Sequence, residues 1–471
     1  MGAGESSLQQ RKELREAEAT FSPEERSRLQ ECFRNLSGGK PSFSLQDFEK
    51  FTKQVLSENA RVQIFSEFLD TAKSLKHQQH QKPGESMTIT QEALTVVLSH
   101  LLKGSTEDMA EIFKRLAAGP ARCVTHDQLI KCLEDMINMY ILIETDTPEF
   151  STWSVSVSTN AADRLAEYLI MDLKSSDARG FDLASIEKWM VTSSLVLTMM
   201  NAIFHTAFHF KHFDEELNLR SFYVPTIPFC FNALQQEQHI WRGFNTIFDI
   251  PSLLLLNNHI PVEFRRQWRL LFASGKHGES FSTMVKHITS QGPCILVLKD
   301  KQGHTFGGFA SHGFEVGPHC TGDERCFIFS LQPKMCIFEA TGYNQNYCYL
   351  NVHQQTMPNG LGFGGLAEEG RLASFSVWLE SEYGRGRCAK HSTTFNSPQL
   401  SATPDFAFDT LEVWGVGPRK DIVKEKRGSL LDMDPEVKAM LAMIGKGPHS
   451  EGLRQGDKTA RNPEQHALHG P

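Results

Sequence analysis

The sequence lacks the features of a secreted or membrane-spanning chain. No hydrophobic signal peptide precedes its ten cysteines, and these are scattered without C-x-x-C pairs. Reduced cytosolic thiols are therefore a simpler interpretation than a disulfide framework. The most apolar stretch, residues 191–210, contains Asn201, His205 and His209 and so lacks the run of about 20 apolar residues that a bilayer requires. We expect this stretch to form a buried helix of a globular domain.

An excess of basic charge is also lacking. The formal net charge of the 471 residues is −8 and is spread along the chain, whereas a general nucleic-acid-binding protein needs a basic face. We therefore expect no nucleic-acid partner. The length allows two or three domains, and 40% hydrophobic with 22% charged residues is typical of globular proteins. Because no pattern resembles a catalytic triad, we expect a binding protein without catalytic residues or a cofactor.

The N-terminus carries a lipidation pattern. Its first six residues, MGAGES, fit M-G-x-x-x-[ST], which predicts myristoylation of Gly2 after the initiator methionine is removed. Chance agreement is the alternative, because short patterns are permissive. One myristoyl chain binds a membrane only weakly and reversibly, and residues 1–20 hold three basic against four acidic residues. Stable membrane attachment would therefore need a protein partner as well.

One motif recurs in the first half of the chain. An apolar residue followed by Ser, Thr or Asp begins a helix at four places, centred on Phe43, Ile89, Val124 and Phe181. The arrangement resembles the second half of an EF-hand. Residues 21–235 are therefore predicted to form an all-α, EF-hand-like module whose helix pairs offer a groove to a partner. Generic helical hairpins are the alternative.

The loops of this module lack calcium ligands. In the first copy, loop positions 1, 3 and 5 fall on Leu36, Gly38 and Lys40, and only Asp47 could coordinate. In the third copy the last position is Gln128. Calcium takes about six to eight oxygen ligands, several of them carboxylates. We therefore expect no calcium and no other metal.

Two segments interrupt the helical pattern. Residues 145–160 are rich in Ser and Thr and include a proline, which predicts a surface loop or linker. The helical signal ends again near Pro225 and Pro228, and we place a domain boundary near residue 240. Beyond it, Pro261–Gly275 is predicted to be a helix because four apolar residues follow helical spacing, namely Phe264, Trp268, Leu271 and Phe272. A second helix is expected after Ser280.

Short apolar runs separated by turn residues then predict strands. Seven are expected, at Cys294–Leu298, His304–Ala310, Arg325–Leu331, Met335–Ala340, Tyr347–Asn351, Ser374–Glu380 and Thr410–Val416. Tight turns between strands, with helices ahead of them, favour an antiparallel two-sheet arrangement over a βαβ sheet. The fold class is therefore α+β.

Three patterns suggest chemistry and are better explained by structure. The segment Gly360–Gly365 resembles a dinucleotide-binding glycine loop, but no strand precedes it and no amphipathic helix follows, so we interpret it as a structural turn. His319 and Cys320 with Cys326 and Cys336 lack the paired spacing of zinc ligands. Cys294 or Cys348 could pair with His277, His304 or His353 as an activated thiol, although buried structural thiols are the simpler interpretation.

Eight fragments in order resemble a TLDc domain over residues 243–417. They are WRLLFASGKHGESF, GPCILVLKD, FGGFAS, GDERCFIFSLQP, TGYNQNYCYLN, QQTMPNGLGFGG, TTFNSPQLS and LEVWGVG. Together with Gly2 and the EF-hand-like half, the chain is most similar to the N-myristoylated, lysosomal branch of this family that is associated with mTOR. One departure follows Gly365, where the family usually continues Gly-Gly-Gln and this chain has Leu366.

The resemblance implies a β-sandwich flanked by helices and no established catalytic residues. It also implies binding to the vacuolar proton pump, the V-ATPase, and a role in nutrient signalling through mTOR and cell growth. The expected location is the cytoplasmic face of the lysosomal membrane and the cytoplasm, with Gly2 as the lipidation site. An oxidation-resistance protein with thiol-dependent antioxidant activity is the alternative function.

The C-terminal tail predicts one more helix. Residues 418–446 are interpreted as a charged linker and an amphipathic helix, which carries one apolar stripe of Val437, Met440, Leu441 and Ile444. This stripe either docks on its own domain or enters a groove of a partner, and we favour the partner. Residues 447–471 are polar and punctuated by Gly and Pro, which predicts disorder.

Overall fold

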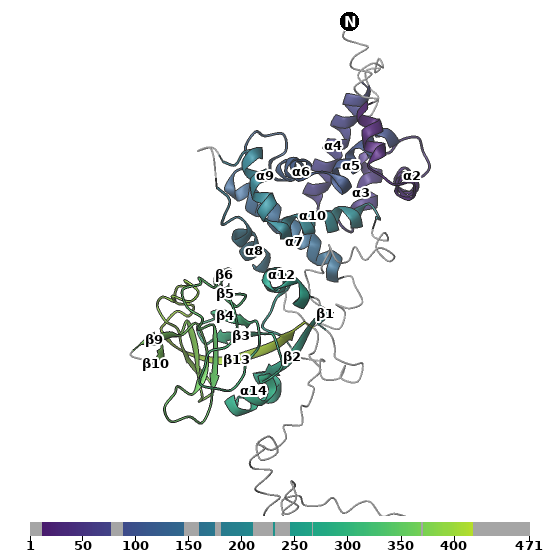
Figure 1. The fold of residues 1–471 in the computed structure, drawn as a ribbon. Coiled ribbons are helices and arrows are strands. Elements are labelled where there is room, and N and C mark those ends of the chain that lie inside the picture. The colour runs from purple at the N-terminus through teal and green to yellow at the C-terminus, as the bar shows by residue number, and fades with distance from the viewer. Residues whose placement is uncertain are drawn as a thin grey trace, which may run out of the picture. The chain divides into compact units, whose positions relative to one another are not determined.

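A computed structural model describes residues 12–76, 88–145, 160–174, 180–210, 229–230, 245–265, 267–368 and 371–417 (Figure 1). The chain divides into two compact units, residues 1–419 and 420–471, and the second lies wholly outside the described ranges. In the first unit helices come first and a large, mainly antiparallel sheet follows. The predicted α+β class is therefore confirmed.

The first half of the described chain is helical. The predicted linker 145–160 lies almost entirely outside the described residues. Several helices begin with a capping box, as at Ser22, Ser44 and Ser105, where the serine hydroxyl and an acidic residue three positions later exchange hydrogen bonds with each other's backbone N–H. The helices of this half are α2 (Pro23–Ser37), α3 (Leu45–Thr52), α4 (Glu58–Lys76), α5 (Gln91–Lys103), α6 (Thr106–Ala118), α7 (His126–Thr145), α8 (Ala161–Leu169), α9 (Leu183–Thr192) and α10 (Ser194–Ala207).

The four predicted EF-hand-like copies pair two by two. Phe43 and Ile89 form an isolated antiparallel bridge, with N···O distances of 3.1 and 3.0 Å. Val124 and Phe181 form a second bridge, with two N···O distances of 2.9 Å. Each motif residue thus joins its loop to the loop of the neighbouring copy, as EF-hand loops do in pairs. This pairing favours the EF-hand-like interpretation over generic helical hairpins.

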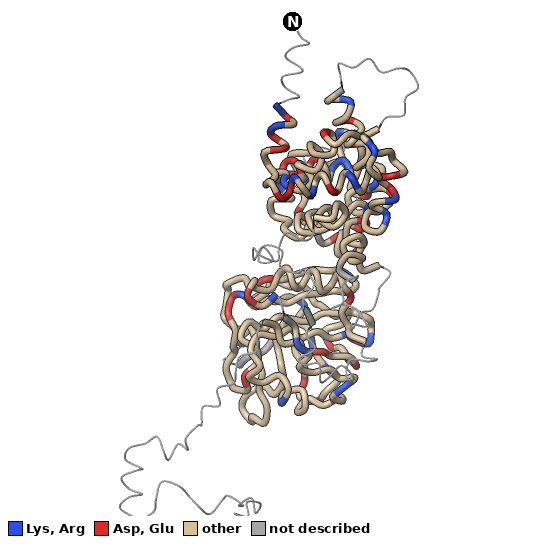
Figure 2. Tube along the Cα trace, turned by 90° about the vertical axis from the view of Figure 1, so that its right-hand side faces the viewer, with Lys and Arg blue, Asp and Glu red and all other residues tan. Residues whose placement is uncertain are grey.

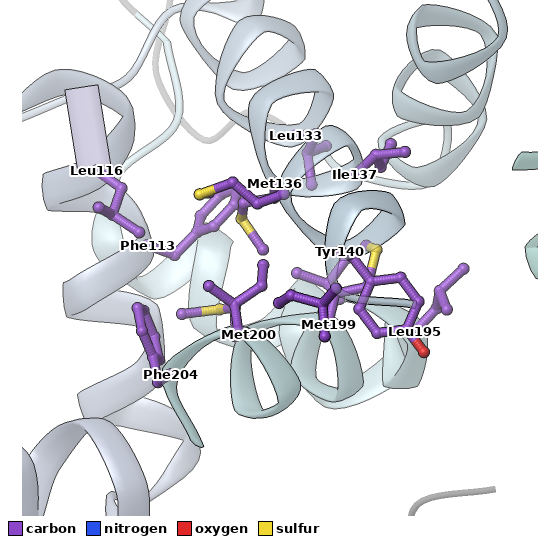
Figure 3. Packing of buried hydrophobic residues seen from close by; sticks show 14 of the residues in the cluster. Phe113, Leu116, Leu133, Met136, Ile137, Tyr140, Leu195, Met199, Met200 and Phe204 are labelled. Carbon is purple, nitrogen blue, oxygen red and sulfur yellow. The ribbon is translucent and has the colours of Figure 1, made fainter. Parts of the chain in front are cut away.

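The helices enclose a core rich in methionine and phenylalanine. Figure 3 shows Phe113 of α6 and Met136 of α7 near Met200 and Phe204 of α10. All four side chains are at most 2% exposed. Because methionine is unbranched and adaptable, it fills the irregular gaps between aromatic rings. Burial on several sides explains why the stretch 191–210 is so apolar.

That stretch is not one continuous helix. α9 ends at Thr192, and α10 begins at Ser194. Val196, Met199 and Ile203 of α10 are buried, in agreement with the expected buried helix. Among the described residues no single helix is long and apolar enough to cross a membrane. The pair α9 and α10 reaches that length and composition only together, with a bend of 97° between them.

The described part of the second half contains strands and four helical segments. The helical segments are α12 (Ile250–His259), the 3₁₀ turn η4 (Val262–Phe264), α13 (Ser274–His277) and α14 (Phe281–Ile288). The strands are β1 (Phe229–Cys230), β2 (Gln267–Ala273), β3 (Cys294–Asp300), β4 (Thr305–Ala310), β5 (Phe327–Gln332), β6 (Cys336–Glu339), β7 (Cys348–Asn351), β8 (Gly360–Phe363), β9 (Leu366–Glu368), β10 (Arg371–Ala373), β11 (Val377–Glu380), β12 (Arg385–Arg387) and β13 (Asp405–Val416). The seven predicted strands and the helix after Ser280 are confirmed.

Most of the described strands form one hydrogen-bonded path that folds into two layers, whereas β9 and β10 pair only with each other. The order of this path is β6-β5-β4-β3-β13-β12-β11-β8-β7, with β2 also paired to β13. The first three residues of the long strand β13 pair with β12, and the rest pairs with β3 and β2. We call β2–β6 the first layer and β7, β8, β11 and β12 the second layer, joined by β13.

The two layers enclose a second apolar core. Phe306 of β4 meets Phe406 of β13, and Phe314, which follows β4, meets Phe363 of the second layer, with ring centroids 5.3 and 5.7 Å apart. A Cβ atom at Gly308 would lie within 2.7 Å of the Phe363 ring, so only glycine allows this approach. The opposite face of the first layer belongs to the core that also contains α12. The first layer is therefore covered on both faces.

One predicted helix is wrong. Residues 261–275 contain the short turn η4, strand β2 and the start of α13. Strand β2 pairs with β13 and has a bulge at Leu271, because Phe272 lies opposite Val413 while Leu270 lies opposite Trp414. The bulge turns neighbouring side chains to different cores: Trp268 enters the core with α12, and Phe272 enters the core between the layers. Because both faces of β2 are buried, its apolar residues occur at a spacing that resembles the spacing on one face of a helix.

Candidate functional site

The residues predicted for lipidation and partner binding lie outside the described ranges. These are Gly2 and the stripe of Val437, Met440, Leu441 and Ile444. The lipidation site and the partner-binding stripe therefore stay predictions.

The EF-hand-like loops carry hydrogen bonds where calcium ligands would stand. Asp47 occupies the position of the last calcium ligand, but it caps α3, accepting from the backbone N–H of Ser44 at 2.9 Å and from its hydroxyl at 2.7 Å. Gln128 occupies the same position in the third copy and accepts from the backbone N–H of Thr125 at 2.9 Å. Within the described residues, no group of three or more His, Cys, Asp or Glu side chains could hold a metal ion.

The glycine-rich segment is a strand and not a turn. Gly360–Phe363 forms β8 between β7 and β11 and is fully buried. A Cβ atom at Gly362 would lie 2.6 Å from the Phe375 ring, and one at Gly360 would lie 2.4 Å from the Trp378 ring. The predicted turn is therefore wrong. The glycines leave room for two aromatic rings that cover the strand.

These rings form the floor of a groove on the outer face of the second layer. Tyr349, Gly362, Trp378 and Arg387 stand opposite one another in register across four strands. The Phe375 and Trp378 rings stack with centroids 4.6 Å apart. The groove has a volume of about 940 Å³, and its other lining residues include Pro358, Asn359, Glu382, Lys390 and His391.

The rim of the groove is charged with both signs. Arg387 donates to Glu380 at 2.8 Å and lies 3.8 Å from Asp405. The hydrogen bond from Arg387 to Glu380 raises the pKa of the guanidinium, which therefore stays charged. Figure 2 shows the same intermixing of basic and acidic residues elsewhere in the described chain. An aromatic floor with a polar rim is typical of a protein-binding surface.

A loop of the same domain presents an exposed tyrosine. Tyr343 is 73% exposed. The loop beneath it is fixed, since Thr341 donates through its N–H to Thr394 O at 2.9 Å and Asn346 donates to Gly365 O at 2.9 Å. A tyrosine on a preorganised loop binds a partner at little entropic cost.

The thiol–histidine pairs that the sequence left as an alternative do not form, and the thiols are buried as expected. Cys294 and Cys348 are completely buried between the layers, and burial raises the pKa of both thiols. His277 packs on Phe272 and His287 instead. Within the described ranges, neither thiol has a hydrogen bond with His277, His304 or His353.

Two buried polar contacts connect α8 to α12 and to Asp249, which caps the start of α12. Arg164 of α8 donates to Asp249 at 2.9 Å, and these side chains are 12% and 6% exposed. Tyr168 of α8 and His259 of α12 are hydrogen-bonded at 3.0 Å. Burial lowers the pKa of His259, which favours the neutral ring needed to share this hydrogen bond.

Sequence reasoning did not find the groove, the fixed Tyr343 loop or the Arg164–Asp249 pair. The groove's residues come from five separate segments, and the ion pair joins positions 85 residues apart. The glycines facing aromatic rings were the one available signal, but glycine in a strand is ambiguous until its neighbour is known.

The second half of the chain matches a known domain family. A model of the TLDc domain matches residues 242–417, which contain α12, both sheet layers and the groove. Mouse nuclear receptor coactivator 7 shares this part, being 33% identical over 172 residues, which cover 35% of this chain and 17% of that protein.

The similarity to other relatives extends almost end to end. The chain is 34% identical to MTOR-associated protein MEAK7 of Gallus gallus, over 92% of this chain and 95% of that protein. The identity is also 34% to the Homo sapiens protein, over 92% and 96%, and to the Danio rerio protein, over 97% and 99%. The chain therefore belongs to the family of TLDc-domain proteins that contains MTOR-associated protein MEAK7.

Proposed function

We propose that this protein is a non-enzymatic adaptor at the lysosomal membrane that binds the V-ATPase and supports mTOR signalling in the nutrient response and cell growth. The observation that carries the proposal is the 34% identity along nearly the whole chain to proteins named as mTOR-associated. Similarity of this extent includes the helical module and not only the TLDc domain. Association with the mTOR pathway is the part that these names support directly.

The described surface supports binding over catalysis. The groove beside Trp378 and the fixed loop of Tyr343 offer aromatic contacts on rigid elements, which are the usual energetic centres of protein interfaces. The thiols of Cys294 and Cys348 point into the core, where they contribute to packing. Two accessible surfaces on one domain suit an adaptor that contacts more than one partner.

Membrane location and pump binding are assigned to the two ends of the chain. A myristoyl group on Gly2 would supply weak affinity for the cytoplasmic face of the lysosomal membrane. The stripe of Val437, Met440, Leu441 and Ile444 would insert into a groove of the V-ATPase. Neither contact is strong enough alone. When one of them has formed, however, the other end of the chain is held near its own binding site, which raises its effective concentration there.

The proposal is tested by recovering V-ATPase subunits with the full chain and with a variant that lacks residues 430–446. Recovery should fall strongly when the segment is removed. A matched control replaces the same segment by a polar sequence of equal length, which separates loss of the stripe from loss of length. Unchanged recovery with both variants would show that residues 430–446 do not bind the V-ATPase.

The lipid is tested by replacing Gly2 with Ala. Lysosomal enrichment should fall, while binding to the isolated pump in detergent should not change. Undiminished enrichment of the variant would show that the lipid is dispensable.

Thiol-dependent antioxidant activity is the second candidate. Its support is the contact between the Cys326 and Cys348 sulfurs at 3.8 Å, because this hydrogen bond lowers the pKa of Cys326 to about 7 and so favours the thiolate. An antioxidant enzyme would consume many equivalents of hydrogen peroxide per chain when a thiol reductant is supplied. Consumption that stops after one equivalent would exclude turnover.

A further inference from the structure

Two buried thiols touch each other between the sheet layers. Cys326 directly precedes β5 of the first layer, and Cys348 begins β7 of the second layer. Their sulfur atoms are 3.8 Å apart, and the residues are 1% and 0% exposed. At this distance no atom fits between the two sulfurs. A disulfide requires only that side chains already in contact close by about 1.8 Å, since its S–S bond is about 2.05 Å long.

Backbone hydrogen bonds fix this contact. Thr321 and Cys348 exchange hydrogen bonds in an isolated antiparallel bridge, with N···O distances of 2.7 and 3.0 Å. The N–H of Cys326 donates to Asp323 O at 3.0 Å, which closes the turn that follows the bridge. The turn 321–326 is thereby held against β7, so that the two sulfurs meet.

The surroundings make the two sulfurs chemically unequal. The backbone N–H of Ser311 donates to the Cys326 sulfur at 3.4 Å, and its hydroxyl oxygen lies 3.2 Å away. That hydroxyl oxygen also accepts from the N–H of Asp323 at 3.1 Å, which leaves its own hydrogen available to the sulfur. The Cys348 thiol is the further donor and lowers the pKa of Cys326, while burial raises the pKa of Cys348 well above its usual range. One sulfur therefore favours the thiolate and its neighbour the thiol.

The Cys326 sulfur lies directly under a surface turn. A Cβ atom at Gly322 would lie 2.7 Å from this sulfur, and Gly322 has a φ of +97°, so the bare backbone of the turn is its cover. Gly322 is half-buried, and the next two residues after Asp323, Glu324 and Arg325, are exposed. Displacement of this turn would open a route for a small oxidant to the thiolate.

We propose that Cys326 and Cys348 are a reversible oxidation site for hydrogen peroxide, with a disulfide between the two sheet layers as the product. The Cys326 thiolate attacks one peroxide oxygen, the O–O bond breaks, and a sulfenic acid and hydroxide result. The Cys348 sulfur then attacks the Cys326 sulfur, so that the S–S bond forms, the S–O bond breaks, and water leaves with the thiol proton. Two thiols are oxidised while one peroxide is reduced to water, and a dithiol reductant reverses the change.

The disulfide would change the stability of the domain. It would close a loop between positions 22 residues apart and tie the first layer to the second. Such a link removes conformations from the unfolded chain. The oxidised protein should therefore melt at a higher temperature than the reduced protein. This inference does not depend on pump binding or on mTOR association.

The test treats the reduced full-length protein with hydrogen peroxide and then alkylates it under denaturing conditions. Alkylation should find two fewer thiols than the ten cysteines of the sequence, and peptide mapping should find Cys326 joined to Cys348. A dithiol should restore both thiols. Loss of no thiol, or cross-links between other cysteines alone, would overturn the proposal.

Variants separate the roles of the two thiols. Cys348→Ala removes both the second thiol and one donor to Cys326, so a sulfenic acid should form on Cys326 more slowly but persist and be labelled by dimedone. The matched control Cys388→Ala, also at a buried thiol, should still form the disulfide. Ser311→Ala keeps both thiols but removes a donor to the thiolate, so peroxide should react several-fold more slowly. Ser311→Ala also keeps the test decisive if Cys348→Ala does not fold. An unchanged rate in Ser311→Ala would contradict the assignment of Cys326 as the attacking thiolate.

Discussion

Glu412 of β13 allows a prediction in which two opposing effects must be weighed. The residue is 1% exposed, and its carboxylate accepts from Thr246 Oγ1 at 2.7 Å, Ile247 N at 2.8 Å and Trp414 Nε1 at 2.8 Å. The three donors favour the ionised form, but burial opposes it more strongly and raises the pKa of Glu412 to about 6. The acid therefore ionises less readily in the fold than in the unfolded chain.

The magnitude follows from the change in pKa. From its ordinary value of 4.5 to about 6, the shift corresponds to about 2 kcal/mol of unfolding free energy. Because the folded pKa is raised, this stability is fully present below pH 4.5 and is lost as the pH rises through 6. About 1 kcal/mol of the loss falls between pH 5 and 7.5.

The variant Glu412→Gln cannot ionise and isolates this effect. Urea unfolding of both proteins should be followed by tryptophan fluorescence at several pH values, with the exposed Glu324→Gln as a control. The stability of the wild type relative to Glu412→Gln should decrease by about 1 kcal/mol from pH 5 to 7.5. A difference that does not change with pH, or a wild type that gains stability, would show that the three donors outweigh burial.

Three further outcomes follow from individual contacts. Arg164→Ala leaves Asp249 buried without its counter-ion, with Ser252 still donating to the carboxylate, and should reduce the unfolding free energy by about 3 kcal/mol. Lys301→Ala at an exposed ion pair should cost at most about 1 kcal/mol in the same urea titration. Gly362→Ala places a Cβ atom 2.6 Å from an aromatic ring and should lower the melting temperature, with a cost of about 1–3 kcal/mol; Gly275→Ala, which meets open space, should not. Calorimetric titration with calcium should give no binding heat at micromolar concentrations, and a saturable heat would reverse the interpretation of the EF-hand-like loops.

Much of the β-rich half could be predicted because its strands are short apolar runs between glycine-containing turns. The turn Asp300–Gly303 is an example, since Gly303 has a φ of +88° and the Asp300 carboxylate accepts from the N–H groups of Gln302 and His304. The EF-hand-like copies, although not the bridges between them, were predictable for a similar reason. Phe43 and its counterparts stand at a fixed position before a helix cap in each copy.

The predictions for β2 and β8 were wrong because both strands are buried on more than one side, so their sequences lack the alternation of apolar and polar residues that identifies a strand. In β2 a bulge at Leu271 directs neighbouring apolar residues to two cores, and the resulting spacing imitates a helix. In β8 the glycines provide no side-chain pattern, and only the Trp378 and Phe375 rings of other segments explain them. Contacts such as Arg164 with Asp249 arise from packing between distant segments, which no local pattern contains.

The central claim, that the protein binds the V-ATPase on lysosomes, is tested most directly by proximity labelling in cells. The full chain and a variant without residues 430–446 should carry the same labelling enzyme at equal expression. The account predicts labelled V-ATPase subunits with the full chain and a marked loss of that labelling with the variant. Labelling of lysosomal membrane proteins without enrichment of V-ATPase subunits by the full chain would contradict it.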